Sequence, residues 1–320
     1  MSGTPTVSVV MTCYNEGPWI GAAVRSVLDQ TRADRIADIV IADDGSDAAT
    51  LAVLGEIERW DARIRVLRGP GGAGISAQRN WAIGEGAAPL IALLDGDDLW
   101  APDKLERQLP VFADARVGLC YSDLLHFAGE DLATARRAGV KDITGARDLT
   151  RAYVLNDPPI IPSTVVLRRS ALEVAGGFDE AVTVFEDTDL FIRMSRACRF
   201  ALVDAPLTLK RYRTSSITGG RKDLMAHHAL VAFRATATEP RLLPLVPRRL
   251  SERARKLGNQ HLLMDDPKAA AGFYGLAVRL RPVSLGAWAG VLLTSAAGAP
   301  VLGWLRRRLR KRRAALGVSG

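Results

Sequence analysis

At residues 90–98 the chain reads Leu-Ile-Ala-Leu-Leu-Asp-Gly-Asp-Asp, five apolar residues followed at once by an acidic turn. A continuous apolar run of this length indicates a strand buried on both faces, as in a parallel sheet covered by helices. Three earlier apolar runs are each followed by a turn and by apolar residues at helical spacing, and they lie at residues 7–12, 36–42 and 64–67. This alternation predicts an α/β fold with a mainly parallel sheet covered by helices.

Acidic residues follow two of these runs. Asp43 and Asp44 follow the second run, Asp95 and Asp97 follow the fourth, and we expect the two runs to be adjacent strands. Because ligands of a parallel sheet bind beyond the carboxyl ends of its strands, the acidic groups are expected to share one site. Carboxylates gathered there repel unless a cation offsets them, and oxygen ligands suit Mg²⁺ or Mn²⁺ shared with phosphates. Taken singly, each cluster would more readily indicate a solvated turn or a helix cap.

Two other kinds of loop fit the sequence poorly. An EF-hand calcium loop requires glycine at its sixth position, which is Trp100 when the loop starts at Asp95. The glycine-rich segment 69–74 is not followed by the Gly-Lys-Ser/Thr that completes a P-loop, so we interpret it as a flexible loop.

Several short motifs occur in an order that resembles glycosyltransferase family 2, an inverting, nucleotide-sugar-dependent family with the GT-A fold. The resemblance covers roughly residues 6 to 215. Each motif is weak by itself, but their shared order and spacing make chance agreement unlikely. They lie at residues 7–16, 41–46, 76–80, 93–98, 102–105, 176–179 and 186–190.

The resemblance implies a binding site for the nucleotide-sugar donor. Asp44 would accept a hydrogen bond from N3–H of a uracil, and Tyr14 would stack on the base. The guanidinium of Arg79 would offset diphosphate charge, although a solvated helix arginine is the ordinary alternative. The donor-binding residues implied are Thr12, Tyr14, Asn15, Glu16, Asp44, Arg79, Asp95 and Gly96.

The same resemblance identifies Asp95-Gly96-Asp97 as the DxD motif of the family. Asp97 would bind the divalent metal, Mn²⁺ or Mg²⁺, that bridges the two phosphates, and Asp95 would face the ribose or a metal-bound water. The metal would act as a Lewis acid on the leaving nucleoside diphosphate. Gly96 would allow close approach of the donor or simply form the turn, and Asp98 would serve only the following turn.

Inversion at an anomeric carbon requires a base that removes the proton of the acceptor hydroxyl. The resemblance assigns this role to Asp187, and Glu186 is the rival candidate. Like charge nearby would raise the pKa of the base. An acidic helix N-terminus describes the same residues and does not exclude catalysis. We expect direct displacement, because no nucleophile–base pair is recognisable in the sequence.

The alternation of strand and helix patterns changes near residue 116 and again near residue 222. The 320 residues are enough for one large domain and an appendage. We expect the GT-A domain over residues 1–221. Its nucleotide-sugar half would cover about 1–115, and its acceptor half about 116–221, with short strands near Gly118 to Tyr121 and Thr164 to Leu167. Residues 222–320 are expected to form a helical extension with a basic tail.

Within the extension, proline and capping signals predict helices at residues 250–264 and 268–280. Residues 283–305 carry no charge and precede seven basic residues within 306–313. Such a segment is compatible with a membrane-spanning helix. Its glycines and Pro300 favour instead two short helices on the protein or membrane surface, with the basic cluster attracted to anionic lipid. An ordinary soluble end is the third alternative.

The formal net charge of +8 falls to +1 without the seven charges of the tail. A nearly neutral body without a basic stripe interleaved with aromatic residues argues against nucleic acid as a partner. Cys13, Cys120 and Cys198 form no CxxC pair, which disfavours a zinc site or disulfide framework and fits a reducing compartment. With no signal-peptide pattern, we expect a cytoplasmic protein, peripheral on the inner face of the cell membrane if the tail binds lipid.

The function implied is transfer of a sugar, with inversion, from a nucleotide-sugar to a hydroxyl of a glycan or lipid-linked acceptor in cell-surface polysaccharide or glycoconjugate synthesis. A UDP-sugar is the expected donor. Two other classes stay open. A sugar nucleotidyltransferase would carry a glycine-rich signature with a basic residue near its first strand, which residues 12–17 lack. A catalytically silent glycan- or partner-binding module would not need intact Asp97 and Asp187.

Overall fold

The chain divides into two compact units, Met1–Gly220 and Arg221–Gly320, and each is described by itself. The structure is a computed structural model. It describes residues 6–129, 131–156, 158–212, 223–295, 298 and 300.

Strands and helices alternate through the first part of the first unit, as the apolar runs predict. Asp47 caps the second helix, since its Oδ1 accepts a hydrogen bond from the backbone N–H of Thr50 at 2.8 Å. The elements are β1 Val7–Cys13, α1 Gly17–Leu28, the 3₁₀ turn η1 Ala33–Arg35, β2 Ile36–Asp43, α2 Ala48–Ile57, β3 Ile64–Arg68, α3 Ile75–Glu85 and β4 Leu90–Asp95.

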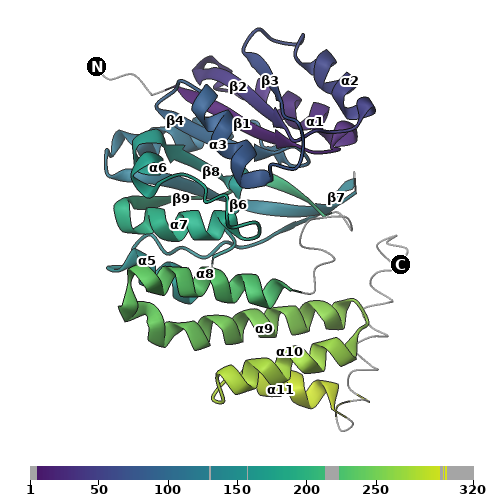
Figure 1. The fold of residues 1–320 in the computed structure, drawn as a ribbon, viewed down its shortest axis with the longest axis vertical. Coiled ribbons are helices and arrows are strands. Elements are labelled where there is room, and N and C mark those ends of the chain that lie inside the picture. The colour runs from purple at the N-terminus through teal and green to yellow at the C-terminus, as the bar shows by residue number, and fades with distance from the viewer. Residues whose placement is uncertain are drawn as a thin grey trace. The chain divides into compact units, whose positions relative to one another are not determined.

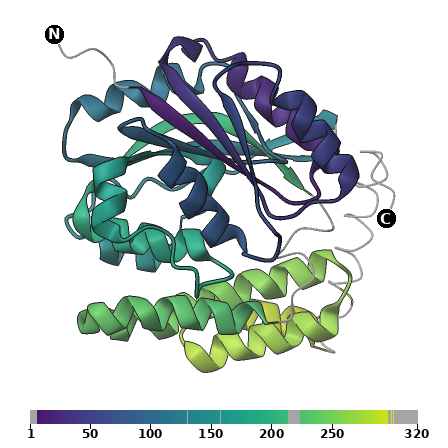
Figure 2. The same ribbon diagram turned by 45° about the horizontal axis from the view of Figure 1, so that its top comes forward.

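These four strands lie parallel in the order β3-β2-β1-β4, and helices cover both faces of the twisted sheet (Figures 1 and 2). The strand order reverses between β1 and β4, which is where ligands of open α/β sheets bind. The predicted α/β architecture is confirmed. The expectation that the two acidic runs are adjacent strands is wrong, because β1 lies between β2 and β4.

The rest of the first unit mixes parallel and antiparallel strands. β8 pairs antiparallel with β4 and β6, whereas β9 runs parallel to β6. The elements are β5 Leu99–Trp100, α4 Lys104–Gln108, η2 Leu109–Ala113, β6 Val117–Ala128, β7 Asp131–Arg137, α5 Leu149–Asn156, η3 Pro162–Thr164, β8 Val165–Arg168, α6 Arg169–Ala175, α7 Glu186–Ala197 and β9 Arg199–Tyr212.

One strand of this part is much longer than expected. A short strand was predicted near Gly118 to Tyr121, but β6 continues to Ala128 because β9 pairs with it along its length and β7 pairs with its end. Ser122 and Asp123 are buried within it. Two buried polar residues in succession break the apolar pattern from which strands are predicted.

The second unit is helical, with α8 Leu224–Thr238, η4 Pro240–Leu245, α9 Val246–Leu263, α10 Pro267–Leu280 and α11 Leu285–Thr294. The two predicted helices correspond to α9 and α10. Tyr274 of α10 is buried against Gly258 of α9 and Gly290 of α11. A Cβ added at either glycine would lie less than 3 Å from the Tyr274 ring, so the two glycines permit the close approach of α9 and α11 to this ring. The Tyr274 hydroxyl donates to Asn259 Oδ1 at 2.8 Å.

Among the residues that the structure describes, no helix has the length and apolar character needed to span a bilayer. Of the uncharged segment, residues 285–294 form α11. The predicted basic tail, residues 306–313, lies outside the described residues.

Candidate functional site

The carboxyl ends of three neighbouring strands form one edge of the sheet. Thr12 of β1 is the register partner of Asp95 of β4, and Cys13 is the partner of Asp43 of β2. Three of the predicted site segments are thus brought together by strand pairing. Asp43 is fully buried, and its Oδ2 accepts hydrogen bonds from the backbone N–H groups of Gly45 and Ser46, both at 3.1 Å. This carboxylate holds the turn that presents Asp44.

The loop after β1 presents an aromatic ring to solvent. The side chain of Tyr14 is 61% exposed. Asn15 adopts a positive φ of 53°, and its Oδ1 accepts a hydrogen bond from the backbone N–H of Asp47 at 2.8 Å. Its own N–H donates to Ser46 Oγ at 2.9 Å. Asn15 therefore fastens the β1–α1 loop to the β2–α2 loop and leaves the Tyr14 ring accessible.

The carboxylate of Asp44 organises the glycine-rich segment. It accepts hydrogen bonds from the backbone N–H groups of Ala73 and Gly74, both at 3.0 Å, and from Gln78 Nε2 at 2.9 Å. A Cβ on Gly45 would lie 2.6 Å from the Cα of Gly71. The turn after β2 and the glycine-rich segment can therefore pack closely because both residues are glycine. The segment interpreted as a free loop is thus folded over Asp44, beside the N-terminus of α3.

The acidic turn after β4 packs tightly against β1 and α1. A Cβ on Gly96 would lie 2.3 Å from Glu16 Oε2 and 3.0 Å from the Thr12 carbonyl oxygen. Glu16 and Thr12 occupy the space beside this glycine, which favours the turn and packing role left open for Gly96. The next residue, Asp97, is 8% exposed, and its carbonyl oxygen accepts a hydrogen bond from Arg211 Nε at 3.0 Å.

Asp98 connects the turn to distant parts of the chain. Its carboxylate is fully buried and accepts hydrogen bonds from Ser163 Oγ at 2.7 Å and from the Arg211 backbone N–H at 3.0 Å. Lys210 Nζ lies 3.6 Å from its Oδ2. Burial raises the pKa of Asp98 to about 6; Lys210 opposes this shift and the charges of Asp95 and Asp97 add to it. Asp98 thus fixes β9 and η3 to the turn as well as serving the turn itself.

Arg79 of α3 joins the two acidic clusters. Its guanidinium, 3% exposed, donates to Asp95 Oδ1 at 2.8 Å and to Glu186 Oε1 at 2.5 Å, and it lies over the Phe178 ring at 5.2 Å. Burial opposes the charged form, but the carboxylates of Asp95 and Glu186 outweigh it and raise the pKa of Arg79. The structure therefore places Arg79 between two protein carboxylates, and its expected contact with the donor diphosphate stays a prediction.

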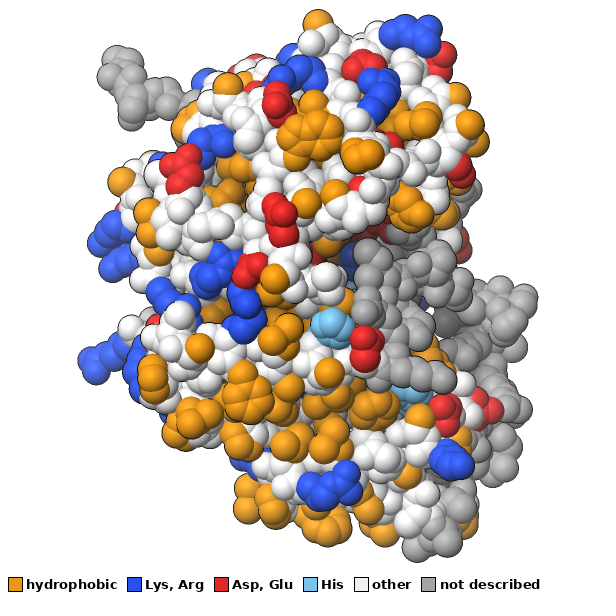
Figure 3. Space-filling view, viewed as in Figure 1, with side chains coloured by type: hydrophobic (Ala, Val, Ile, Leu, Met, Phe, Trp, Pro, Cys, Tyr) orange, Lys and Arg blue, Asp and Glu red, His pale blue; other side chains and the backbone are white. Residues whose placement is uncertain are grey.

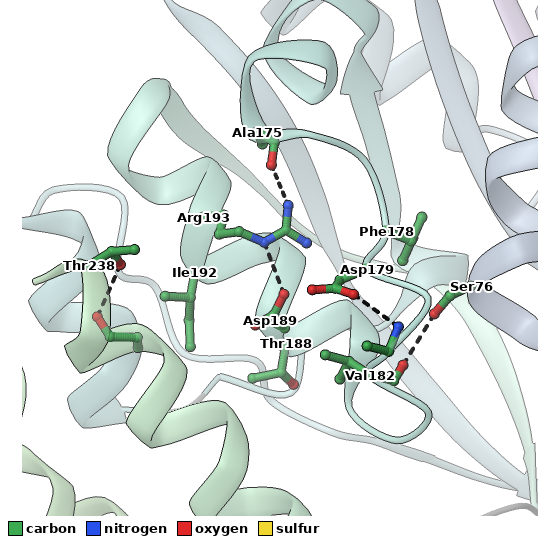
Figure 4. A network of polar contacts seen from close by, with 12 residues as sticks. Ser76, Ala175, Phe178, Asp179, Val182, Thr188, Asp189, Ile192, Arg193 and Thr238 are labelled. Carbon is green, nitrogen blue, oxygen red and sulfur yellow. Dashed lines mark hydrogen bonds and ion pairs between the residues drawn. The ribbon is translucent and has the colours of Figure 1, made fainter.

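The segment that leads into α7 is held by other side chains of α3. Asn80 binds the backbone of Phe178 at both ends of its amide: Nδ2 donates to the carbonyl oxygen at 2.8 Å, and Oδ1 accepts from the N–H at 3.0 Å. Ser76 Oγ donates to the Val182 carbonyl oxygen at 3.2 Å (Figure 4). One face of α3 therefore positions both the arginine bridge and the loop before Glu186.

Asp189, also in the acidic motif, has a local role. Its Oδ2 accepts a hydrogen bond from Arg193 Nε at 2.9 Å, and Arg193 in turn donates to the Ala175 carbonyl oxygen at the end of α6 (Figure 4). These contacts connect α6 to α7.

The two candidate bases begin α7 immediately after a residue in the left-handed region. Phe185 has a φ of 61°, which is rare for a bulky side chain and is concentrated at functional sites. Asp187 is partly exposed, and its Oδ1 accepts hydrogen bonds from the Thr188 N–H at 2.6 Å and hydroxyl at 3.2 Å. Burial, followed by the charge of Glu186, raises the pKa of Asp187 to about 7. Glu186 is engaged by Arg79, whereas Asp187 is hydrogen-bonded to its neighbour Thr188.

A second cation, Lys210, lies among the carboxylates. Burial opposes its charged form, but the carboxylates of Asp98, Asp95, Asp97 and Asp187 outweigh burial and raise the pKa of Lys210. Sequence reasoning missed Lys210, Arg211, Ser163 and Asn80. Asn80 lies in a quoted motif, but the others carry no local signal because their partners come from distant segments.

The carboxylates of this region fit a divalent metal shared with a ligand. No group of three or more His, Cys, Asp or Glu side chains is arranged to hold a metal by itself within the described residues. The donors at the turn are carboxylate oxygens, however, from Asp95 and Asp97. Mg²⁺ is typically held by one or two protein carboxylates, and phosphate oxygens and water complete its coordination. The acidic turn can supply the carboxylates.

Comparisons with known proteins agree with this architecture. Residues 8–176 match the family described as Glycosyl transferase family 2. Over 209 residues the chain is 35% identical to UDP-Glc:alpha-D-GlcNAc-diphosphoundecaprenol beta-1,3-glucosyltransferase WfgD of Escherichia coli, covering 65% of this chain and 77% of that protein. The chain spans less of other curated relatives, 41% and 26% of two of them.

Solved structures share the fold at low identity. TarS residues 1–349 of S. aureus, in complex with UDP-GlcNAc, align with a TM-score of 0.61 and 18% identity over 94% of this chain and 92% of that one. The mannosyltransferase PcManGT of Pyrobaculum calidifontis, in complex with GDP-Man and Mn²⁺, aligns with a TM-score of 0.56 and 20% identity, covering 99% and 88%.

Proposed function

The chain belongs to glycosyl transferase family 2 and has its GT-A fold, and from this premise we propose that it transfers a sugar, with inversion, from a UDP-sugar to a hydroxyl of a glycan or lipid-linked acceptor. The names of two similar proteins support the substrates. WfgD is named for UDP-glucose and a diphosphoundecaprenol-linked sugar, and the TarS structure holds UDP-GlcNAc. The product would serve cell-surface polysaccharide or glycoconjugate synthesis.

The observation that carries the proposal is the link from Asp95 through Arg79 to Glu186, beside Asp187. It joins the carboxyl end of β4, where donors of such sheets bind, to Glu186, whose neighbour Asp187 has a pKa raised to about 7. A base of that pKa accepts the proton of an attacking hydroxyl efficiently at neutral pH. Asp187 would remove this proton, while Glu186, engaged by Arg79, would keep the start of α7 in place.

The donor would lie along the ends of β1, β2 and β4. Exposed Tyr14 offers its ring to the nucleobase, and Asp44 offers acceptor oxygens that now hold the glycine-rich segment. Thr12, Glu16 and Gly96 shape the floor between these strands, and Asn15 fixes the Tyr14 loop. Residues 1–115 would thus bind the donor and residues 116–221 the acceptor, with 222–320 as the helical extension.

Asp97, assisted by Asp95, would hold Mn²⁺ or Mg²⁺ against the diphosphate of the donor. Once bound, the ion would supply Lewis-acid stabilisation of the negative charge that develops on the leaving nucleoside diphosphate. The adjoining residues of this chain keep the acidic turn in position: Asp98 is fixed by Ser163 and by Arg211.

The donor test is incubation with UDP-, dTDP- and GDP-sugars and Mn²⁺, scored by nucleotide release. Release of UDP together with a glycosylated acceptor is expected. Release of pyrophosphate would instead indicate a sugar nucleotidyltransferase, and no release with any donor would indicate a silent binding module.

We further propose that the second unit contacts the inner face of the cell membrane, making this a cytoplasmic, peripheral protein. Apolar side chains gather on its surface (Figure 3). Leu285, Trp288 and Leu292 of α11 are exposed by 84%, 51% and 62%, and their i, i+3, i+7 spacing places them on one helix face. The basic residues within 306–313 follow closely in the sequence. An apolar helix face followed by arginines suits the boundary of an anionic membrane.

Flotation with vesicles tests this second proposal. Vesicles containing phosphatidylglycerol should carry the protein, whereas phosphatidylcholine vesicles should not, and Trp288→Glu or deletion of residues 300–320 should weaken binding. A truncated protein that still fractionates wholly with membranes would contradict a role for the tail.

A further inference from the structure

Lys210 is fixed beside the acidic turn by the strand that carries it. Leu209 pairs with Leu99 in the β5–β9 ladder, directly after the turn. On the other side of Lys210, the backbone N–H of Arg211 donates to Asp98 Oδ1, and Arg211 Nε donates to the Asp97 carbonyl oxygen. The backbone of Lys210 is therefore held on both sides by the turn.

The Lys210 ammonium group faces the acidic cluster without being tightly bound by it. Its ion pair with Asp98 Oδ2 is 3.6 Å long, beyond the usual range of a hydrogen bond, and one-third of its side chain (33%) is exposed. Asp98 does not depend on this contact for hydrogen bonding, since Ser163 and the Arg211 N–H already donate to its two oxygens. A lysine retained only to satisfy Asp98 would be expected closer to it.

Arg79 and Lys210, two of the cations of the region, differ in how accessible they are. Arg79 is 3% exposed and donates to two protein carboxylates. Lys210 is more exposed and carries three N–H donors on a flexible stem. An anion that arrives at the acidic turn can therefore be met by Lys210 without breaking a short hydrogen bond, whereas Arg79 is buried and already donates to Asp95 and Glu186.

We propose that Lys210 binds the diphosphate of the nucleotide-sugar donor, together with whatever cation the turn holds. The inference rests on the proposed function and adds a donor-binding residue to it. Lysine is a common point-charge partner of phosphate, and a charge-assisted hydrogen bond in a partly desolvated site strengthens binding by one to two orders of magnitude. Arg79 then has a positioning role, and the direct contact assigned to it from the sequence passes to Lys210.

The test measures affinity for UDP and for uridine by titration calorimetry with the full-length protein, using Lys210→Met and Lys210→Arg. Lys210→Met should weaken the affinity for UDP by about 10- to 100-fold and change the affinity for uridine by less than about twofold. In the proposal, only the phosphates contact the ammonium group. Lys210→Arg, which keeps the charge, should recover most of the UDP affinity. The matched control is Lys141→Met, which removes an exposed lysine paired with Asn156; it should bind both ligands normally.

Binding of Mn²⁺ alone provides a second readout. Lys210→Met removes a positive charge from beside the carboxylates, so the protein without nucleotide should bind Mn²⁺ more tightly, even as UDP binds more weakly. A general structural defect would weaken both.

The outcomes separate this inference from the proposed function. If the wild-type protein transfers sugar but Lys210→Met binds UDP normally, or loses UDP and uridine affinity together, the role of Lys210 is overturned alone. If the wild-type protein releases nucleotide from no donor, the proposed function fails, and the Lys210 assignment fails with it.

Discussion

The acidic turn after β4 and the acidic start of α7 are two carboxylate clusters built in different ways. The turn is fixed from several directions: Asp98 is fully buried and hydrogen-bonded to Ser163 and Arg211, and Lys210 lies beside it. The start of α7 follows a strained residue, Phe185, and depends on α3 for its position through Arg79 and Asn80.

In the proposed function, the two clusters would carry out two kinds of chemistry. A cluster that holds a cation and a diphosphate must keep negative charge in a fixed geometry, which the dense contacts of the turn provide. A base must change its protonation state, and the raised pKa of Asp187, about 7, suits the role proposed for it. Arg79 connects the two clusters through its ion pairs with Asp95 and Glu186.

The largest effect is expected at Asp187. Asp187→Asn should lower kcat by about 10²–10⁴-fold, the usual contribution of a general base, while the affinity for UDP stays within about twofold. The rate of sugar transfer measures kcat, and titration calorimetry measures the affinity for UDP. Asp204→Asn, a change at an exposed carboxylate paired with Arg137, is the control and should leave both unchanged. Full transfer activity in Asp187→Asn would assign the base elsewhere.

The next largest effect is expected at Asp97, in the other cluster. Asp97→Asn should reduce kcat/KM by about 10²–10³-fold, the several kcal/mol that a Lewis acid contributes, and should require much higher Mn²⁺ for half-maximal rate. A titration of rate against Mn²⁺ measures this, with surface Asp103→Asn as the control. An unchanged Mn²⁺ requirement would show that Asp97 does not hold the metal. The proposed difference in chemistry between the acidic turn and the start of α7 would then be wrong.

How far the sequence predicts this site depends on the range of the contacts. The strands up to β4 and their acidic ends are local patterns, and the four strands form where expected. The ion pair between Arg79 and Glu186 joins residues that are 107 positions apart in the sequence. The hydrogen bond from Asn80 to Phe178 joins residues that are 98 positions apart. No periodicity signals such pairs, because each is created by the packing of α3 against a loop from the second half of the unit. Lys210 is unremarkable in sequence for the same reason.

A smaller effect, on stability, is expected at the bridge. Arg79→Met removes a buried cation from between Asp95 and Glu186, and the loss of both ion pairs should lower the free energy of unfolding by about 3 kcal/mol. Urea denaturation at pH 7 measures the change. The control Arg59→Met breaks an exposed pair with Glu56 and should cost less than about 1 kcal/mol. Equal effects of the two changes would show that the clusters are not coupled through Arg79.

The smallest effect is expected at Glu186, and it decides between the two candidate bases. Because the base must be deprotonated, the wild-type rate should fall as the pH drops below about 7, by up to tenfold per unit. The charge of Glu186 contributes to the raised pKa of Asp187, so Glu186→Gln should move this acid limb to lower pH by up to about one unit. Burial, the larger cause, remains.

At pH 8 the Glu186→Gln enzyme should therefore keep its kcat to within about threefold, since Asp187 is ionised in both proteins. Exposed Glu173→Gln on α6 is the matched control and should leave the pH profile in place. A loss of 10²-fold or more at pH 8 would make Glu186 the base. Glu186 would then accept the proton while the Arg79 guanidinium donates to its Oε1 at 2.5 Å.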